Sequence, residues 1–305
     1  MRIVSLLPSA TEIVGFLGLT DALVGVSHEC DYPAVVTDRP RVTSSIIPHG
    51  LTPAEIDAQV SAAVREGRPL YQVDQAALAE LKPDLIVTQG ICDVCAVSEG
   101  TVAHALDALP AELVEGVTVL SLDGRDFEGV LADILAVGEA AGVAERAAAA
   151  VEVARQRWVS LKRAQADGGP RVLMLEWSEP PFYGGHWVPE MVAAAGGVDP
   201  FGAVGTDSGR LTWEQVAEAD PDVIVVMACG YGLEDNVRFA RALYDDPAVD
   251  RLRALREERL WACDANSYFS RPAPRLVRGA ELLAHIFTGT DEALPGEAVP
   301  VRRRS

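Results

Sequence analysis

Short apolar runs alternate along the chain with longer segments whose apolar positions recur every three or four residues. This pattern is typical of strands that alternate with helices. In the first half it predicts strands at residues 2–6, 23–27, 84–88 and 117–122, and helices at 9–17, 75–81, 100–109 and 127–141. In the second half it predicts strands at 172–176, 223–227 and 260–263, and helices at 189–195, 213–219 and 274–287. Such an alternation indicates an α/β fold with parallel sheets and crossover helices.

The two halves of the chain resemble each other. LKPDLIVT at residues 81–88 matches ADPDVIVV at 219–226. Between them, residues 144–166 hold neither Gly nor Pro and consist mainly of strong helix formers. We interpret this segment as a helix that bridges two Rossmann-like lobes with a ligand cleft between them. The expected division is an N-terminal lobe at 1–142, the bridging helix at 143–167 and a C-terminal lobe at 168–305. An ordinary amphipathic helix within one α/β domain is the alternative.

The composition excludes some partners. The chain has 305 residues and a net charge of −19, which repels nucleic acid and anionic membranes. The apolar start, residues 1–19, carries a single Arg and is interrupted by Glu12, so it is a poor signal peptide. Ser9 and Glu12 match a capping box at a helix start instead. We therefore expect a cytoplasmic chain without membrane insertion, or a periplasmic or extracellular one if a signal was removed.

All five cysteines lie at or just past the end of a predicted strand: Cys30, Cys92, Cys95, Cys229 and Cys263. Ligands of parallel sheets bind beyond the carboxyl ends of the strands, so several thiols are expected near one site. An odd number of cysteines argues for thiols rather than a disulfide framework. The C-x-x-C spacing suits a metal or redox site, for which we select Cys92, Cys95 and Cys263 as candidates. Buried structural thiols are the alternative.

Other polar and aromatic residues occupy the same kind of loop. Their rings are suited to an apolar wall for a large flat ligand, although a hydrophobic cluster that closes a lobe would use the same residues. The candidate ligand-binding residues are His28, Glu29, Cys30, Glu176, Trp177, Phe182, His186, Trp187, Tyr231, Asn266 and Tyr268. No nucleophile, Walker A or dinucleotide motif accompanies them, and acid–base candidates such as His186 lack a partnered nucleophile. We predict no catalytic residues and no enzyme.

Several phrases carry a family resemblance. RIVSLLPSATEI at residues 2–13, VGVS at 24–27 and LKPDLIV at 81–87 resemble the helical-backbone (class III) substrate-binding proteins of ABC importers. YFSRPAPR at 268–275 is similar to the cobalamin-binding branch. The resemblance implies two α/β lobes joined by one long helix. It also implies a cobalamin or other corrinoid, haem or ferric siderophore as a small-molecule ligand, with no cofactor required.

The resemblance further implies an ABC permease as partner. One exposed Glu on each lobe would bind to this permease. Glu214 occupies the second-lobe position, whereas Ala76 occupies the first-lobe position and Glu55 is the nearest substitute. This departure predicts that the chain does not work with a permease in the family's manner. We therefore expect a non-catalytic binding protein for a metal-containing or tetrapyrrole-like molecule. The alternative is a cytosolic metal or metal-cluster handling protein that uses its cysteines.

Overall fold

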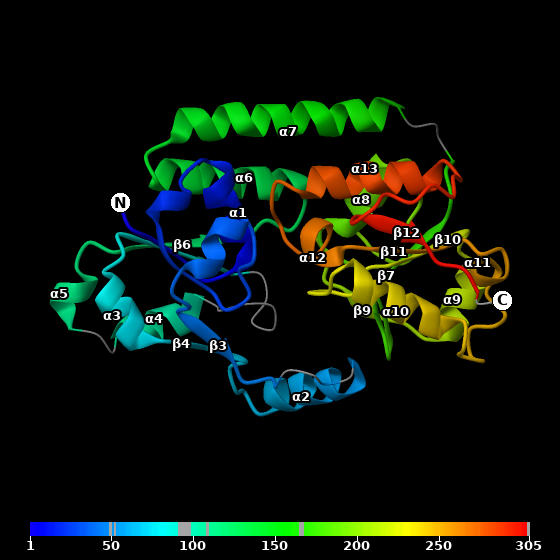
Figure 1. The fold of residues 1–305 in the computed structure, drawn as a ribbon, viewed down its shortest axis with the longest axis horizontal. Helices are drawn as coiled ribbons and strands as arrows, with labels where there is room; N and C mark the ends of the chain where they lie inside the picture. The colour runs from blue at the N-terminus through cyan, green and yellow to red at the C-terminus, as the bar shows by residue number, and fades with distance from the viewer. Residues whose placement is uncertain (49–50, 52, 91–98, 108–109, 165–167, 304–305) are drawn as a thin grey trace. The chain divides into compact units, whose positions relative to one another are not determined.

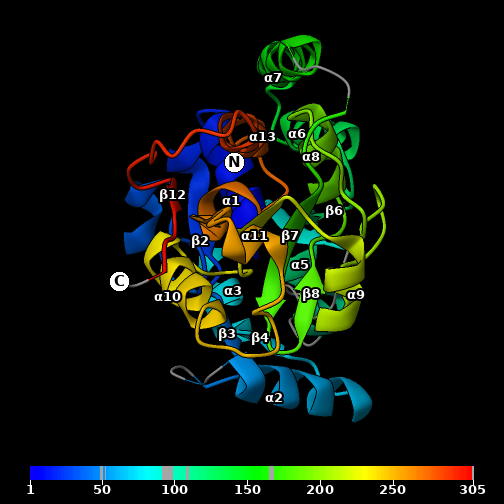
Figure 2. The same ribbon diagram turned by 90° about the vertical axis from the view of Figure 1, so that its right-hand side faces the viewer.

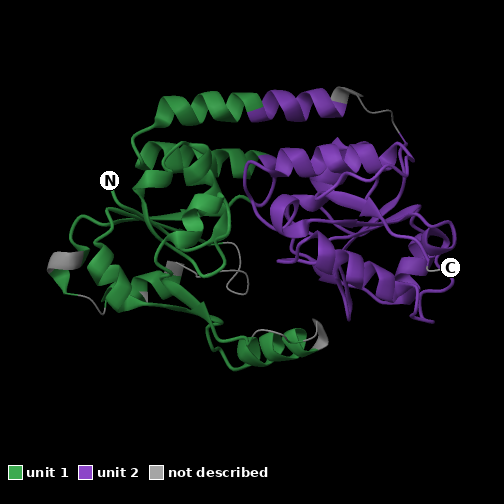
Figure 3. Ribbon diagram, viewed as in Figure 1, with its two compact units in different colours: residues 1–124, 128–153 green, residues 125–127, 154–305 purple. Residues whose placement is uncertain are grey.

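The computed structural model describes residues 1–48, 51, 53–90, 99–107, 110–164 and 168–303 (Figure 1). The chain divides into two compact units, coloured separately in Figure 3. Unit 1 comprises residues 1–124 and 128–153, and unit 2 comprises residues 125–127 and 154–305. The predicted long helix is present as α7 (Ala144–Ala164), and the boundary between the units falls inside it.

Unit 1 contains a parallel four-stranded sheet with the order β2-β1-β5-β6. The strands are β1 (Ile3–Ser5), β2 (Leu23–Val26), β5 (Leu85–Gln89) and β6 (Thr118–Leu122). Helices α3 (Gln75–Leu81) and α4 (Glu99–Asp107) cover one face, because Leu78 and Val102 are buried with Val4 and Ile86 of the sheet. Helices α1 (Pro8–Phe16) and α6 (Phe127–Ala140) lie on the other face (Figure 1).

A small antiparallel pair, β3 (Thr43–Ser45) with β4 (Tyr71–Val73), lies beside the main sheet of unit 1. Helix α2 (Pro53–Arg65) connects these two strands in the sequence. The remaining elements of the unit are α5 (Ala111–Val114) and two 3-10 turns, η1 (Thr20–Ala22) and η2 (Ala34–Asp38). Strand β4 therefore pairs with β3, outside the parallel sheet.

The capping box expected at residues 9–12 is wrong. Helix α1 begins at Pro8, and Leu7 is its N-cap without a side-chain hydrogen bond. Pro at the first helical position fixes a helical φ and has no N–H that needs a cap. Ser9 and Glu12 lie inside the helix, and both are buried.

Unit 2 contains a six-stranded sheet with the order β12-β11-β10-β7-β8-β9. The strands are β7 (Val172–Ser178), β8 (Pro181–Tyr183), β9 (Gly209–Arg210), β10 (Val223–Val226), β11 (Leu260–Cys263) and β12 (Ala298–Pro300). Only β7, β10 and β11 are parallel, as expected; β8, β9 and β12 add antiparallel edges that the sequence pattern did not predict. These edge strands have two or three residues, too few for a clear period.

The helices of unit 2 cover both faces of its sheet (Figures 1 and 2). Helices α8 (Val188–Ala194) and α13 (Leu276–Phe287) pack together on one face. Helices α9 (Trp213–Ala219), α10 (Leu233–Leu243) and α11 (Arg253–Arg256) lie on the other, where their apolar residues are buried with Leu173, Ile224 and Leu260. The short helix α12 (Ala265–Tyr268) follows β11 directly. The three central strands are thus buried from both sides, as in other parallel sheets.

The second half of α7 packs within unit 2. The indole of Trp158 stacks on the ring of Phe127, with ring centroids 4.0 Å apart and planes inclined by 8°. Glu190 of α8 accepts a hydrogen bond from the Phe127 amide at 3.0 Å and forms an ion pair with Lys162 at 3.5 Å. Residues 125–127 are held in unit 2 by these contacts. Within the described part of the chain, none of the helices is both long and apolar enough to span a membrane.

Candidate ligand-binding site

In unit 1, the loop after β2 holds His28 against the β3–β4 pair. The backbone N–H of His28 donates to the Thr43 hydroxyl at 3.0 Å, and His28 Nδ1 forms a second hydrogen bond with the same oxygen at 2.7 Å. The imidazole lies 5.7 Å from the ring of Tyr71. His28 is half-buried and Glu29 is exposed, so both side chains are accessible at the carboxyl end of the sheet.

Cys30 belongs to a buried polar cluster rather than to the surface of this loop. Its sulfur lies 3.0 Å from the Thr11 hydroxyl and 3.3 Å from the Ser27 hydroxyl, and the residue is only 1% exposed. Arg41 Nη1 donates to the carbonyl oxygens of Ser27 and Cys30 at 2.8 and 2.7 Å. These bonds hold the loop in place because they satisfy the carbonyl groups where the strand ends.

In unit 2, three partly exposed aromatic side chains gather where β7 and β10 end. Trp177 of β7 is paired with Phe182 of β8, and its ring centroid lies 6.0 Å from that of Tyr231. Tyr231 in turn packs edge-on against Phe239 at 5.0 Å. We call Trp177, Phe182 and Tyr231 the Trp177 cluster. Burial raises the pKa of Tyr231, with a further contribution from Asp235, so its phenol is neutral at physiological pH.

The loop after β11 is tied to the Trp177 cluster. The backbone N–H of Asn266 donates to the carbonyl oxygen of Tyr231 at 3.0 Å. The backbone N–H of Gly230 donates to the Ser270 hydroxyl at 3.3 Å. Arg271 is only 7% exposed, and its Nη2 donates to Asn266 Oδ1 at 2.8 Å. This bond fixes the side chain of Asn266, whose backbone joins the loop after β11 to the loop that carries Tyr231. Sequence reasoning missed Arg271, although it lies within the phrase YFSRPAPR.

Trp187 and His186 point to different partners. The indole N–H of Trp187 donates to the Phe269 carbonyl at 2.7 Å, and the residue is only 8% exposed, so most of its surface is committed to the interior of unit 2. His186 Nε2 lies 3.2 Å from Asp207 Oδ1, to which Arg125 also donates at 2.9 Å. Burial lowers the pKa of His186, which favours the neutral imidazole.

The remaining candidates near β7 and β11 are also half-buried. Glu176 precedes Trp177 on β7, and its carbonyl oxygen accepts a hydrogen bond from the Cys229 amide at 3.3 Å. Tyr268, at the end of α12, donates its phenol to Glu297, and burial raises its pKa. The structure therefore brings Trp177, Phe182, Tyr231 and Asn266 together, with Tyr268 on the same short helix as Asn266.

The cysteines occupy different environments. Cys263 is completely buried in β11, and burial raises the pKa of its thiol far above the ordinary range. Since metals bind the thiolate, this environment favours a structural role. Cys229 is exposed on the loop after β10. Cys92 and Cys95 lie outside the described residues, and elsewhere in the described chain no three His, Cys, Asp or Glu side chains come together as a metal site.

The two residues selected as docking carboxylates both lie in the first turn of a helix. Glu214 lies in the first turn of α9, after a capping box made by Thr212 and Gln215. Its side chain is 72% exposed and pairs with Arg251 at 3.3 Å. Glu55 lies in the first turn of α2 and is exposed. Both positions are accessible to a partner.

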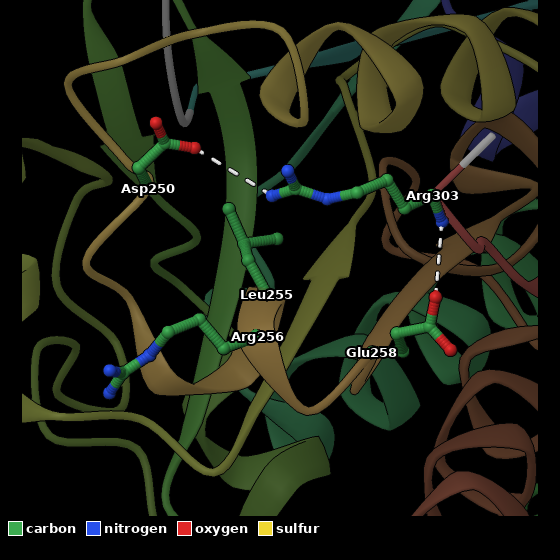
Figure 4. Close-up of a pocket in the computed structure, with 5 residues that line it drawn as sticks. All are labelled: Asp250, Leu255, Arg256, Glu258 and Arg303. Atoms are coloured by element: carbon green, nitrogen blue, oxygen red, sulfur yellow. Dashed lines mark hydrogen bonds and ion pairs between the residues drawn. The ribbon is translucent and has the colours of Figure 1, made fainter. Parts of the chain in front are cut away.

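A shallow hollow at the opposite edge of the unit 2 sheet is a poor ligand site. It is lined by Asp250, Leu255, Arg256, Glu258 and Arg303, from segments before β11 and after β12 (Figure 4). Arg303 pairs with Asp250 at 3.7 Å, and its amide donates to Glu258 at 3.4 Å. The charges of the hollow largely compensate one another, and it lies at the amino end of β11, away from the Trp177 cluster.

The family follows from comparison with known proteins. A family model described as periplasmic binding protein matches residues 3–267, so the chain belongs to the periplasmic binding protein family. A vitamin B12-binding protein of Vibrio cholerae is 25% identical over 287 residues, which are 92% of this chain and 86% of the relative.

Solved structures share the fold. The periplasmic vitamin B12 binding protein BtuF of Vibrio cholerae superposes with a TM-score of 0.64 at 24% identity, covering 94% of this chain and 96% of its own. The periplasmic heme-binding protein RhuT from Roseiflexus sp. RS-1 has a TM-score of 0.70 at 22% identity, and the match covers 94% of this chain and 98% of the RhuT chain. The family and the α/β fold expected from the sequence are thereby confirmed. The expected cytoplasmic location gains no support, because these proteins are described as periplasmic.

Proposed function

We propose that this chain is a non-catalytic binding protein for a metal-containing or tetrapyrrole-like small molecule. The ligand class is that of cobalamin and other corrinoids, haem or ferric siderophores. The observation that carries the proposal is the Trp177 cluster, a group of partly exposed rings at the carboxyl ends of β7 and β10. Flat conjugated ligands stack on such rings.

The relatives support the same ligand class, since they are named for vitamin B12 and heme. Their names do not favour the alternative of a cysteine-based metal handler. We extend the proposal to residues 1–142 and 168–305 as the two lobes, with residues 143–167 as the bridging helix. Within the first lobe, His28 and Glu29 after β2 are the proposed ligand contacts.

The location and partner belong to the same proposal. By analogy with its periplasmic relatives, the chain works outside the cytoplasmic membrane and delivers its ligand to an ABC permease. The exposure of Glu214, and of Glu55 as the first-lobe substitute, supports docking through these carboxylates. The proposal therefore replaces both the cytoplasmic location and the loss of permease docking that the sequence predicted. Fractionation of the native host tests this part, and recovery of the protein from the cytosol alone would contradict it.

Ligand binding is tested by titrating the purified protein with cyanocobalamin, haemin and ferrichrome, while following absorption and tryptophan fluorescence. We expect at least one to bind. Trp177→Ala should weaken that binding about 30-fold, since truncating a central aromatic contact costs about 2 kcal/mol or more. Trp213→Ala is the matched control, because Trp213 is also half-buried but packs against the core beneath α9. A folded wild-type protein that binds none of the three would refute the proposal.

A further inference from the structure

The C-terminal segment places a carboxylate beside the helix that carries Asn266 and Tyr268. Strand β12 runs antiparallel to β11, with Ala298 opposite Cys263. This pairing sets the start of β12 level with the carboxyl end of β11, where α12 begins. Glu297, the residue before β12, accepts a hydrogen bond from the Asp264 amide through its carbonyl oxygen at 2.8 Å. Asp264 is also the N-cap of α12, and its side chain accepts from the Ser267 amide at 3.0 Å.

The side chain of Glu297 joins two partners. Two nitrogen atoms of Arg278 in α13 donate to this carboxylate: Nε to Oε1 at 3.0 Å, and Nη2 to Oε2 at 2.5 Å. The phenol of Tyr268 forms a further hydrogen bond with the same carboxylate. The Arg278 contact lowers the pKa of Glu297, so the group is a charged acceptor at neutral pH. Tyr268 therefore donates, and its ring direction is set by a carboxylate that is itself fixed by a bidentate contact.

The ion pair between Glu297 and Arg278 is the first of a series that continues to α7. Arg278 pairs with Glu281 at 3.5 Å, and Glu281 accepts from Arg157 of α7 at 3.1 and 2.7 Å. On the other side, the guanidinium of Arg275 lies 5.8 Å from the centre of the Tyr268 ring. Within unit 2, alternating charges thus run from α7 through α13 to α12, and they hold Tyr268 at both its hydroxyl and its ring.

We propose that Glu297 is a positioning residue of the ligand site: it fixes α12 and the Tyr268 ring in a binding-ready orientation, and Arg278 fixes Glu297. This inference rests on the proposed function in that Tyr268 is a ligand contact. A side chain that is ordered before binding loses less conformational entropy when the ligand arrives. Groups that hold the contact residue therefore raise affinity without touching the ligand.

The test compares Glu297→Ala with the conservative Glu297→Gln and the control Asp291→Asn. Asp291 lies in the same C-terminal segment but pairs with Arg302, far in sequence from α12. We expect Glu297→Ala to weaken binding of cyanocobalamin or haemin roughly tenfold, as measured couplings between contacting residues suggest. Glu297→Gln, which retains an acceptor for the phenol, should keep most of the affinity, and Asp291→Asn all of it. Should Glu297→Ala fail to fold, Arg278→Lys replaces it, because it removes the bidentate contact and keeps the charge.

Two further measurements separate positioning from general stability. In the Tyr268→Phe background, Glu297→Ala should cost clearly less affinity than in the wild type, since the hydroxyl through which it acts is gone. Hydrogen exchange of residues 264–271, measured without ligand, should accelerate in Glu297→Ala and not in Asp291→Asn. Unchanged exchange together with unchanged affinity would overturn the inference. If the wild type binds neither probe, the proposed function fails by itself, and unchanged exchange in Glu297→Ala remains the result that refutes the positioning role.

Discussion

The buried carboxyl group of Asp133 should make the stability of this protein fall as the pH rises through the mildly acidic range. Asp133, in α6, is 8% exposed and accepts hydrogen bonds from the amides of Asp123 and Gly124 at 3.2 and 2.9 Å. Burial raises its pKa from 3.8 to about 6, against the lowering effect of these two amides, and the nearby Asp123 carboxylate adds a smaller increase.

The sign and the size of this pH dependence follow from the linkage between proton binding and folding. Between about pH 4 and pH 6 the unfolded chain releases the proton of Asp133 while the folded chain keeps it, so the free energy of unfolding decreases. Below this window both states are protonated, and above it both are ionised, so the contribution is constant. At about 1.36 kcal/mol for each pH unit, the difference between 3.8 and about 6 corresponds to a loss of about 3 kcal/mol.

Asp133→Asn removes this loss. Urea unfolding followed by circular dichroism between about pH 4 and pH 7 should show that the variant gains about 3 kcal/mol relative to wild type as the pH rises. The amide also replaces one acceptor, which shifts the whole curve by a pH-independent cost of about 1–3 kcal/mol, so only the slope is diagnostic. Glu139→Gln, an exposed carboxyl group on the same helix, should leave the slope unchanged. Parallel curves for wild type and Asp133→Asn would refute the reasoning.

Three further predictions concern packing and thiol reactivity. Trp158→Ala removes a stacked, buried ring and should destabilise the protein by about 3–5 kcal/mol in urea unfolding; a loss below about 1 kcal/mol would contradict the packing seen here. Gly138→Ala would place a Cβ 2.3 Å from that of Ala147 in α7 and should cost about 1–3 kcal/mol. Gly232→Ala, whose Cβ would meet nothing within 4 Å, should show no such overpacking cost, and only its place as the N-cap of α10 should count. Cys229 should react with a thiol reagent in the folded protein and Cys263 only after unfolding, as mass spectrometry of the labelled peptides can check.

The sequence determined the elements whose signal is local. Helix α7 could be predicted because helix formers continue without Gly or Pro for more than twenty residues. In both halves of the chain an apolar run follows the dipeptide Pro-Asp, and these runs identified β5 and β10. Strands of a parallel sheet that is buried on both faces require such a run. The loops after the strands were selected because ligands of parallel sheets bind beyond the carboxyl ends of the strands. In unit 2 the backbone of Asn266 is hydrogen-bonded to that of Tyr231 in the Trp177 cluster, while the role of these residues stays a prediction.

Only the tertiary structure decided which of these loop residues face inward and what holds them. Trp187 donates to Phe269, 82 positions away, and Cys263 is enclosed by the sheet, although both follow the same local pattern as Trp177 and Cys229. Arg271 and Glu297 lie in segments without a recognisable period, and their roles come from partners on other elements. Periodicity and propensity act over a few residues, so they fix helices and strands. Burial and hydrogen-bond partners are fixed by segments far apart in the sequence, so they are known only once the chain has packed.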